Sequence, residues 1–214
     1  ALYNVVDSMF VSYISEAALT AVSLAYPMQN LMIAVATGTG VGVNALLSRN
    51  LGEKNYSMAN RVAGNAIFLG LVSYVVFALL GLLGSRFYFS VQVEDPNIIA
   101  LGHDYLSIGT ILSIGCFGQV LLSRLLQSTG KTFYSMVIQM VGAGLNLVLD
   151  PIMIFGLLGF PKMGVAGAAL ATVISQLAGT ALGIYYNLRK NPEIQFSLST
   201  LRPSKPVISR IYGV

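Results

Sequence analysis

The sequence is 214 residues long, with 55% apolar and only 9% charged residues and a mean hydropathy of +0.74, whereas an ordinary soluble domain carries about 25% charged residues. This composition excludes a soluble globular domain, and apolar blocks of about 20 residues or more predict helices that cross a hydrocarbon core of about 30 Å. The net charge of +4 does not favour a nucleic-acid partner, because the basic residues lie between the apolar blocks, where membrane topology accounts for them.

Six hydrophobic segments predict an all-α fold, a polytopic bundle of six helices in the lipid bilayer. A transmembrane β-barrel would need segments of about 10 residues with alternating polarity, but residues 66–83 are apolar on every side. Helices satisfy their own backbone hydrogen bonds in lipid and therefore fit this pattern. The segments run over residues 1–15, 19–47, 58–83, 98–126, 133–158 and 165–188.

The first segment is shorter than a full span. Residues 1–15 make a helix of roughly 22 Å at about 1.5 Å per residue. The sequence also starts inside this segment without Met or a charged flank, so we expect the natural chain to begin about 20 residues upstream. A signal peptide is excluded, because the basic leading region is missing and Asp7 lies in the middle of the segment.

The basic residues predict the orientation of the bundle. They follow the second segment, separate the fourth from the fifth and follow the sixth, which puts 10 of the 12 on one side. Only Arg86 and Lys162 fall on the other side, together with most of the acidic residues. Cytoplasmic loops carry an excess of Lys and Arg, so we expect a multi-pass protein of the cell membrane with both ends of this chain in the cytoplasm.

Two stretches outside the segments have distinct compositions. Residues 86–96 mix apolar and acidic side chains and predict a short connector on the outer side. Residues 191–214 contain three prolines and several basic residues, and predict a cytoplasmic linker that starts a seventh helix near Pro206. We therefore divide the chain into a membrane lobe, residues 1–190 with a truncated first helix, and a linker, residues 191–214.

Small residues inside the segments predict close packing of helices. Gly38, Gly40 and Gly42 have the spacing that lets membrane helices approach. A phosphate-binding loop would need a lysine in the Walker position, which does not follow Gly42. The single cysteine, Cys116, lies in an apolar block, excludes an internal disulfide and is expected to pack in the core.

Two acidic residues lie in the middle of predicted membrane segments, Asp7 and Asp150. A charge at the bilayer centre costs about 2.5 to 3.5 kcal/mol on insertion scales, so such residues are rare and indicate function by default. The alternative is a neutral, hydrogen-bonded acid that only holds helices together. Asn146 lies four residues before Asp150 on the same helical face, and Pro151, which follows, is expected to bend the helix.

Further polar side chains have a spacing that matches the two acids. Tyr3 lies one helical turn before Asp7, and Thr172 and Gln176, also four residues apart, can present oxygen atoms from the sixth segment. If the two carboxylates lie about 4 Å apart, they repel by about 4 kcal/mol at an effective dielectric constant of 20. A proton or a small hard cation relieves this repulsion, and carboxylate, amide and hydroxyl oxygens suit either.

The sequence therefore predicts a cation-coupling site made of Asp7, Asn146, Asp150 and Thr172. Asp7, Asn146 and Asp150 are the candidate ligands for Na⁺. The neutral oxygens of Asn146 and Thr172 favour a metal cation slightly, but the same groups also hydrogen-bond a protonated acid, so H⁺ and Na⁺ both stay open.

Five motifs, in this order along almost the whole chain, resemble the multidrug and toxic compound extrusion (MATE) transporters. They are LYNVVD at 2–7, SRNLG at 48–52, QSTGK at 127–131, NLVLDP at 146–151 and GVAGAALAT at 164–172. The resemblance implies twelve helices in two six-helix lobes that form an inverted V, joined by a cytoplasmic linker. This chain would be the first lobe, and a second lobe of similar length would follow it.

The resemblance also implies a function. Such a transporter is not an enzyme and needs no cofactor; it expels amphipathic or cationic organic compounds, including drugs, as H⁺ or Na⁺ runs inward. The family's coupling region matches Asp7, Asn146, Asp150 and Thr172. We expect the cavity that receives the substrate to be lined by Tyr3, Asn30, Tyr105 and Gln176.

Three alternatives compete with this interpretation. A flippase for lipid-linked oligosaccharides would need a cationic cavity, and no Arg or Lys lies at the centre of a predicted segment. An intramembrane aspartyl protease would use two aspartates that share a proton, but its signature Gly-x-Gly-Asp is not what precedes Asp150, which follows Leu147-Val148-Leu149. A third alternative is a packing or assembly subunit without transport of its own.

Overall fold

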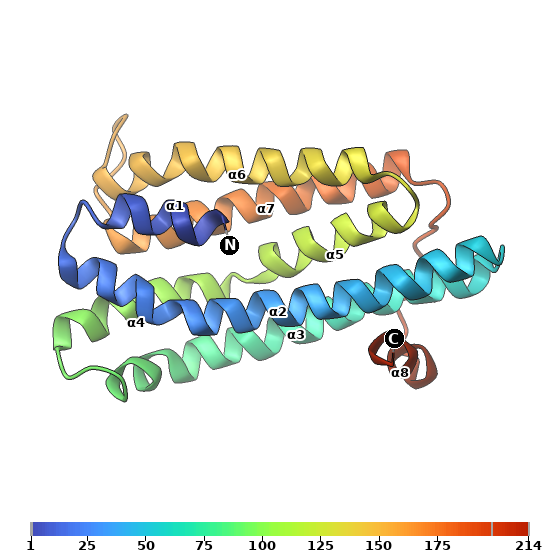
Figure 1. Ribbon diagram of the computed structural model, residues 1–214, viewed down its shortest axis with the longest axis horizontal. Helices are drawn as coiled ribbons and strands as arrows, with labels where there is room; N and C mark the ends of the chain where they lie inside the picture. The colour runs from blue at the N-terminus through green and yellow to red at the C-terminus, as the bar shows by residue number, and fades with distance from the viewer. Residues whose placement is uncertain (1, 198, 214) are drawn as a thin grey trace.

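Most of the described helices run along the long axis of an elongated bundle (Figure 1). The structure is a computed structural model that describes residues 2–197 and 199–213, and no strand occurs in these residues, as expected for the all-α class. Eight helices are present in the described residues: α1 (Leu2–Val11), α2 (Glu16–Gly52), α3 (Tyr56–Ser90), α4 (Pro96–Ile111), α5 (Ile114–Ser128), α6 (Thr132–Phe155), α7 (Val165–Lys190) and α8 (Lys205–Tyr212).

The predicted segments correspond to α1, α2, α3, the pair α4–α5, α6 and α7. Helices α2, α3, α6 and α7 are each long and apolar enough to cross a membrane, and α4 and α5, bent by 44° relative to each other, pass the same test together. The expected single fourth helix is therefore wrong: it breaks at Leu112 and Ser113. Helix α1, with 10 residues, spans about 15 Å and does not cross a bilayer by itself.

Helices α2 and α3 begin before their hydrophobic segments and end after them. Polar caps, and not hydropathy, determine these ends: Ser15 Oγ accepts from the Ala18 amide at 3.1 Å, and Asn55 Oδ1 accepts from the Met58 amide at 3.2 Å. Helix α3 also continues to Ser90, so the expected connector over residues 86–96 is shorter, covering residues 91–95. Asp95, the last residue of this connector, caps α4 because its carboxylate accepts from the Asn97 amide at 2.8 Å.

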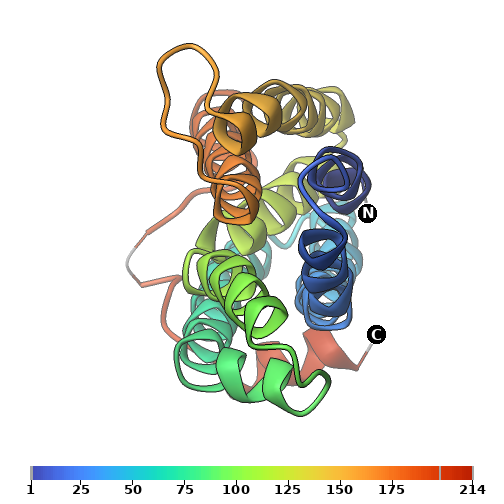
Figure 2. The ribbon, with the colours of Figure 1, turned by 90° about the vertical axis from the view of Figure 1, so that its left-hand side faces the viewer.

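The connectors gather at two opposite ends of the bundle (Figure 1). Residues 12–15, 91–95 and 156–164 lie at one end, and residues 53–55, 129–131 and the last turn of α7 lie at the other. Figure 2, which looks along the bundle, shows α5 in its interior; this helix contacts α2, α3, α6 and α7. The alternation of ends agrees with the sorting of basic and acidic residues in the sequence.

The apolar side chains divide between an interior and an outer surface. Three clusters of buried residues fill the interior, and Cys116 is buried in one of them beside Phe77 and Phe117. On the outside, α3 exposes a run of large aliphatic side chains where it would meet lipid. These are Leu71, Val72, Val75, Val76, Leu79, Leu80, Leu82 and Leu83.

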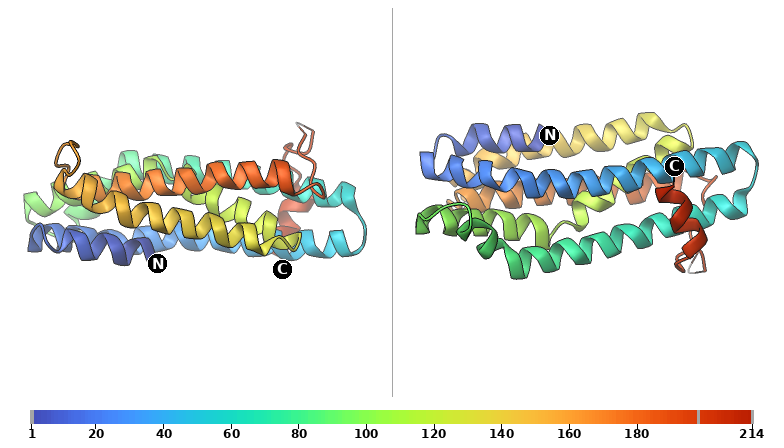
Figure 3. Two further views of the ribbon diagram at one scale, coloured as in Figure 1. Left: turned by 90° about the horizontal axis from the view of Figure 1, so that it is seen from above. Right: turned by 60° about the horizontal axis from the view of Figure 1, so that its bottom comes forward.

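The chain after α7 returns along α3. The Asn60 Oδ1 accepts from the Gln195 amide at 2.9 Å, and the Asn65 Oδ1 accepts from the Ser204 amide at 2.8 Å. Helix α8 then crosses α2 and α3 at a steep angle, as the right panel of Figure 3 shows. Its buried side chains, Val207 and Ile211, join the apolar cluster between α2, α3 and α5.

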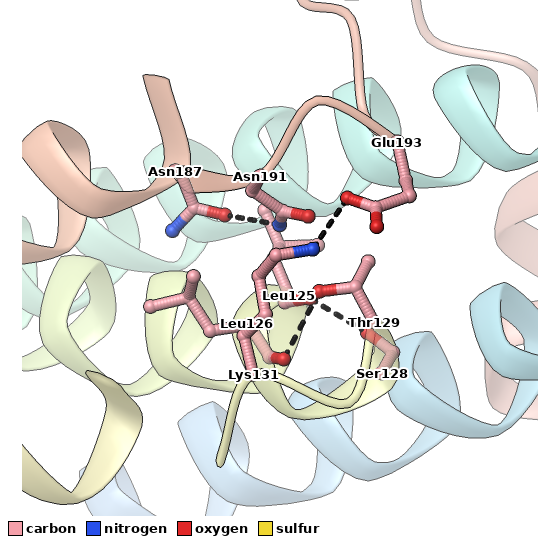
Figure 4. Close-up of polar contacts among 8 residues, drawn as sticks. All are labelled: Leu125, Leu126, Ser128, Thr129, Lys131, Asn187, Asn191 and Glu193. Carbon is pink, nitrogen blue, oxygen red and sulfur yellow. Dashed lines mark hydrogen bonds and ion pairs between the residues drawn. The ribbon is translucent and has the colours of Figure 1, made fainter. Parts of the chain in front are cut away.

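One ion pair anchors the start of this returning segment. The Lys131 ammonium donates to Glu193 Oε2 at 2.5 Å, which ties the α5–α6 connector to the residues after α7 (Figure 4). Beside it, Asn191 Nδ2 donates to Asn187 Oδ1 at 3.1 Å. The segment is thus held by polar contacts at its beginning and by apolar burial at its end.

Candidate functional site

Asp7 of α1 and Asp150 of α6 lie next to each other in the interior of the bundle. Both side chains are fully buried, and one hydrogen-bonded chain joins them, because Asn146 donates to Asp150 and to Thr172, which in turn contacts Asp7. Two buried carboxylates cannot both stay ionised at low cost. Binding of one proton or one cation by the pair lowers this electrostatic cost.

Hydrogen bonds from two further helices, α4 and α7, and from a second residue of α6 surround the acids. The Tyr105 hydroxyl of α4 donates to Asp7 Oδ2 at 2.5 Å, and the Thr172 hydroxyl of α7 lies 3.1 Å from Oδ1 and 3.3 Å from Oδ2 of Asp7. The Asn146 amide Nδ2 of α6 donates to Asp150 Oδ1 and to Thr172 Oγ1, each at 3.1 Å. We name these five residues the acid cluster.

Two oxygens of the acid cluster are left without a partner in the described residues. Asp150 Oδ2 and Asn146 Oδ1 are buried and accept no hydrogen bond there, although buried polar atoms are nearly always paired. No group of three or more His, Cys, Asp or Glu side chains able to hold a metal ion occurs in the part of the chain that the structure describes. The cluster thus fits a proton, or a small hard cation held by carboxylate, amide and hydroxyl oxygens.

Helix α1 is fixed to its neighbour by a second polar contact. The Tyr26 hydroxyl of α2 donates to the Asn4 carbonyl at 2.7 Å and also contacts the Ser8 hydroxyl. Helix α6 continues through Pro151 to Phe155, and because proline has no N–H, the Leu147 carbonyl loses its usual helical partner beside the cluster. The Tyr26 contact thus holds α1, which carries Asp7, against α2.

A cavity of about 330 Å³ lies next to the acid cluster. Tyr3 and Gln176, which the sequence assigned to a cavity, line it. Tyr105 is not among its lining residues, since it is fully buried in the acid cluster, and Asn30 lies on an exposed face of α2. The other lining residues are Ile33, Thr37, Cys116, Gln119, Val120, Ser123, Arg124, Gln127, Gln139 and Ala143.

Sequence reasoning missed Gln119 and Arg124 as cavity residues. Gln119 lies in an apolar segment, where a polar side chain is a signal, and its amide Nε2 donates to the Tyr3 hydroxyl at 3.2 Å. Arg124 belongs to the basic residues that predict the orientation in the membrane, and it is not among the predicted cavity residues. The spacing of Cys116, Gln119 and Ser123 at three and four residues would have indicated one helical face.

The cavity and the acid cluster share three helices and are one turn apart on each. Tyr3 precedes Asp7 by four residues on α1, and Gln176 follows Thr172 by four on α7. On α6, Ala143 precedes Asn146 by three. Helices α1, α6 and α7 therefore contribute side chains both to the acid cluster and to the cavity.

Comparison with known proteins identifies the family. The MatE family profile matches residues 1–152. The chain belongs to this family. It is 30% identical over 98% of its length to a FAD transporter of Shewanella oneidensis, and 26% identical over its whole length to the multidrug export protein MepA of Staphylococcus aureus, covering 47% of each.

A solved structure extends the likeness to the fold. The chain superposes over its whole length, with a TM-score of 0.92 and 26% identity, on 48% of a multidrug resistance MATE family transporter in an inward-facing conformation. The chain thus spans about half the length of the relatives it matches, as the prediction of one lobe requires. MATE proteins are membrane-embedded secondary transporters and not enzymes, so the protease alternative finds no support, and neither does the flippase.

Proposed function

We propose that this chain is the first lobe of a cation-coupled antiporter that exports amphipathic or cationic organic compounds. The observation that carries this proposal is that Asp7 and Asp150, two fully buried acids near a cavity, are joined by the hydrogen bonds of Asn146 and Thr172. The names of the relatives, a FAD transporter and multidrug export proteins, support an organic substrate.

The acid cluster supplies the coupling in this proposal. Loading the Asp7–Asp150 pair with H⁺ or Na⁺ removes the repulsion between two carboxylates, and unloading restores it. Because both acids lie on helices that also line the cavity, the two states differ in how they position α1 and α6. A second lobe, packed against this one, would alternate the access to a cavity near the midplane of the membrane.

The orientation belongs to the same proposal. The end of the bundle that carries Arg49, Lys54 and Lys131 faces the cytoplasm, together with the residues after α7. Drugs would then enter the cavity from the cytoplasm and leave on the other side while the cation moves inward.

Replacement of each acid by asparagine in the full-length protein tests the proposal, since it keeps the size of the side chain and removes its titratable group. In everted membrane vesicles, Asp7→Asn and Asp150→Asn should each abolish ethidium export driven by an imposed H⁺ or Na⁺ gradient. The double variant should be little worse than either single variant, because the two acids act as a unit.

Asp104→Asn is the matched control, since Asp104 is exposed on α4, and it should export normally. Each variant must reach the membrane in wild-type amounts. Normal gradient-driven export by well-expressed Asp150→Asn protein would refute the coupling role and leave Asp150 as a packing residue.

A further inference from the structure

Arg124 is the one charged side chain among the residues that line the cavity. The remaining polar part of the lining consists of hydroxyl and amide groups, with four glutamines among them. No Asp, Glu or His lines the cavity within the described residues. The local charge of this space is therefore positive, in contrast to the acid cluster one turn away.

The guanidinium of Arg124 has most of its hydrogen-bonding capacity free. Its Nη1 donates to Gln127 Oε1 at 3.0 Å, while a guanidinium carries five N–H donors. The two ion pairs in the described part of the chain join Arg49 to Glu53 and Lys131 to Glu193. Arg124 thus has no carboxylate partner among the described residues.

Two neighbours indicate that this end of the cavity is built for a ligand. The Arg124 stem passes over Gly40 of α2, so closely that a Cβ at position 40 would lie 2.8 Å from Arg124 Cγ. The adjacent Ser123, also in the lining, is 4% exposed, and its hydroxyl has no hydrogen-bond partner in the described residues. A buried hydroxyl without a partner costs free energy unless a ligand or water satisfies it.

We propose that the cavity binds amphipathic organic anions, with Arg124 holding a carboxylate or phosphate group of the ligand. A planar acid matches the forked geometry of a guanidinium and forms two parallel hydrogen bonds with it. Ser123 and the glutamines then bind the neighbouring polar atoms, and Ile33 and Val120 contact the apolar part. The inference rests on the proposed function, because it specifies the substrate class of that same cavity.

Two dyes of one ring system and opposite charge test the inference. Fluorescein is an anion and tetramethylrhodamine methyl ester is a cation, and both are xanthenes. Binding of each to the purified full-length protein in neutral detergent is measured by fluorescence polarisation, without any ion gradient. Wild-type protein should bind fluorescein more tightly, and Arg124→Gln should weaken fluorescein binding tenfold or more without weakening the binding of the cationic dye.

Further variants distinguish the loss of the Arg124 charge from a disturbance of the folded structure. Arg61→Gln removes the same charge from an exposed position of α3 and should change neither affinity. Arg124→Lys should retain part of the fluorescein affinity, and Gly40→Ala, which displaces the Arg124 stem, should reduce it. All variants must elute as single species and melt near the wild-type temperature.

Two outcomes would overturn the inference: tighter binding of the cationic dye by wild-type protein, or equal fluorescein affinity in wild-type and Arg124→Gln protein. The absence of fluorescein binding, as when a carboxylate elsewhere in the full-length protein neutralises Arg124, would overturn it as well. Because dye binding requires no gradient, these results are independent of whether Asp7→Asn abolishes coupled export.

Discussion

The hydroxyl of Tyr105 on α4 donates a 2.5 Å hydrogen bond to Oδ2 of Asp7 on α1, 98 residues away in the sequence. Both side chains are fully buried. The contact joins the broken fourth span to the short first helix, and makes Tyr105 a direct neighbour of the proposed coupling site instead of a wall of the substrate cavity.

Removal of this hydroxyl should destabilise the lobe. Tyr105→Phe leaves a buried carboxylate oxygen with one donor fewer, and should lower the free energy of unfolding by about 1–3 kcal/mol. Thermal unfolding in detergent would register this as a lower melting temperature. Tyr13→Phe is the control, because Tyr13 is 75% exposed; equal melting temperatures for the two variants would contradict a contribution from the Tyr105–Asp7 bond.

Two glycines of α2 should respond oppositely to alanine. A Cβ on Gly42 would lie 1.9 Å from the Ile211 carbonyl oxygen, whereas nothing lies within 4 Å of one on Gly38. Gly42→Ala should therefore displace α8, at a cost of about 1–3 kcal/mol, while Gly38→Ala should stabilise the helix by up to about 1 kcal/mol. Limited proteolysis between residues 191 and 204 should accelerate only in Gly42→Ala; equal cleavage in both variants would argue against the docking of α8 on α2.

The ion pair between Lys131 and Glu193 should make stability depend on acidity. Partial burial raises the pKa of Glu193, but the hydrogen bond from Lys131, a backbone hydrogen bond and the charge of Lys131 together outweigh it, so the pKa lies below the ordinary 4.5. A lowered folded-state pKa means that the stabilisation is present above about pH 4.5 and is lost as the pH falls through the lowered value.

Glu193→Gln should accordingly melt at a slightly lower temperature than wild type at neutral pH, with the difference shrinking below about pH 4.5. Glu94→Gln, at the other end of the bundle, is the matched control. A Glu193→Gln difference that stays constant from pH 7 to strongly acidic conditions would exclude the ion pair as its cause.

The orientation in the membrane can be tested with single cysteines. In a Cys116→Ala background of the full-length protein, cysteines at Glu94 and Gly159 should react with an impermeant thiol reagent in intact cells, and cysteines at Asn55 and Phe133 should not. Labelling in permeabilised cells is the control, because each of the four cysteines should react there. Labelling at position 55 but not at position 94 would reverse the proposed topology.

Composition and spacing predicted the all-α class, the spans and the four polar residues that the structure brings together. Hydropathy measures how long an apolar run is, not how its helix is rotated, so it could not place Asn30 on an exposed face or Gln119 in the cavity. The four-residue spacing grouped Thr172 with Gln176 correctly on one face of α7. The spacing places the two residues one turn, or about 5.4 Å, apart along the axis. It could not reveal that Thr172 belongs to the acid cluster and Gln176 to the cavity.

The break in the fourth span was also not predicted from the sequence. Residues 98–126 are mostly apolar and contain no proline, and neither Leu112 nor Ser113 is a residue that breaks a helix as proline does. Helices α4 and α5 both contact α2, α3 and α7, and α5 also contacts α6.

The break between α4 and α5 separates the part of this span that contacts the acid cluster from the part that lines the cavity. At the joint, the bonds from the Ser113 amide to the Thr110 carbonyl and from the Gly115 amide to the Leu112 carbonyl are 3.2 and 3.5 Å long and span three residues each. Tyr105 of α4 contacts Asp7, whereas Gln119 and Arg124 of α5 line the cavity. A rotation about Leu112 and Ser113 would move α5 relative to α4. It would change the shape of the cavity while the hydrogen bond from Tyr105 to Asp7 stays in place.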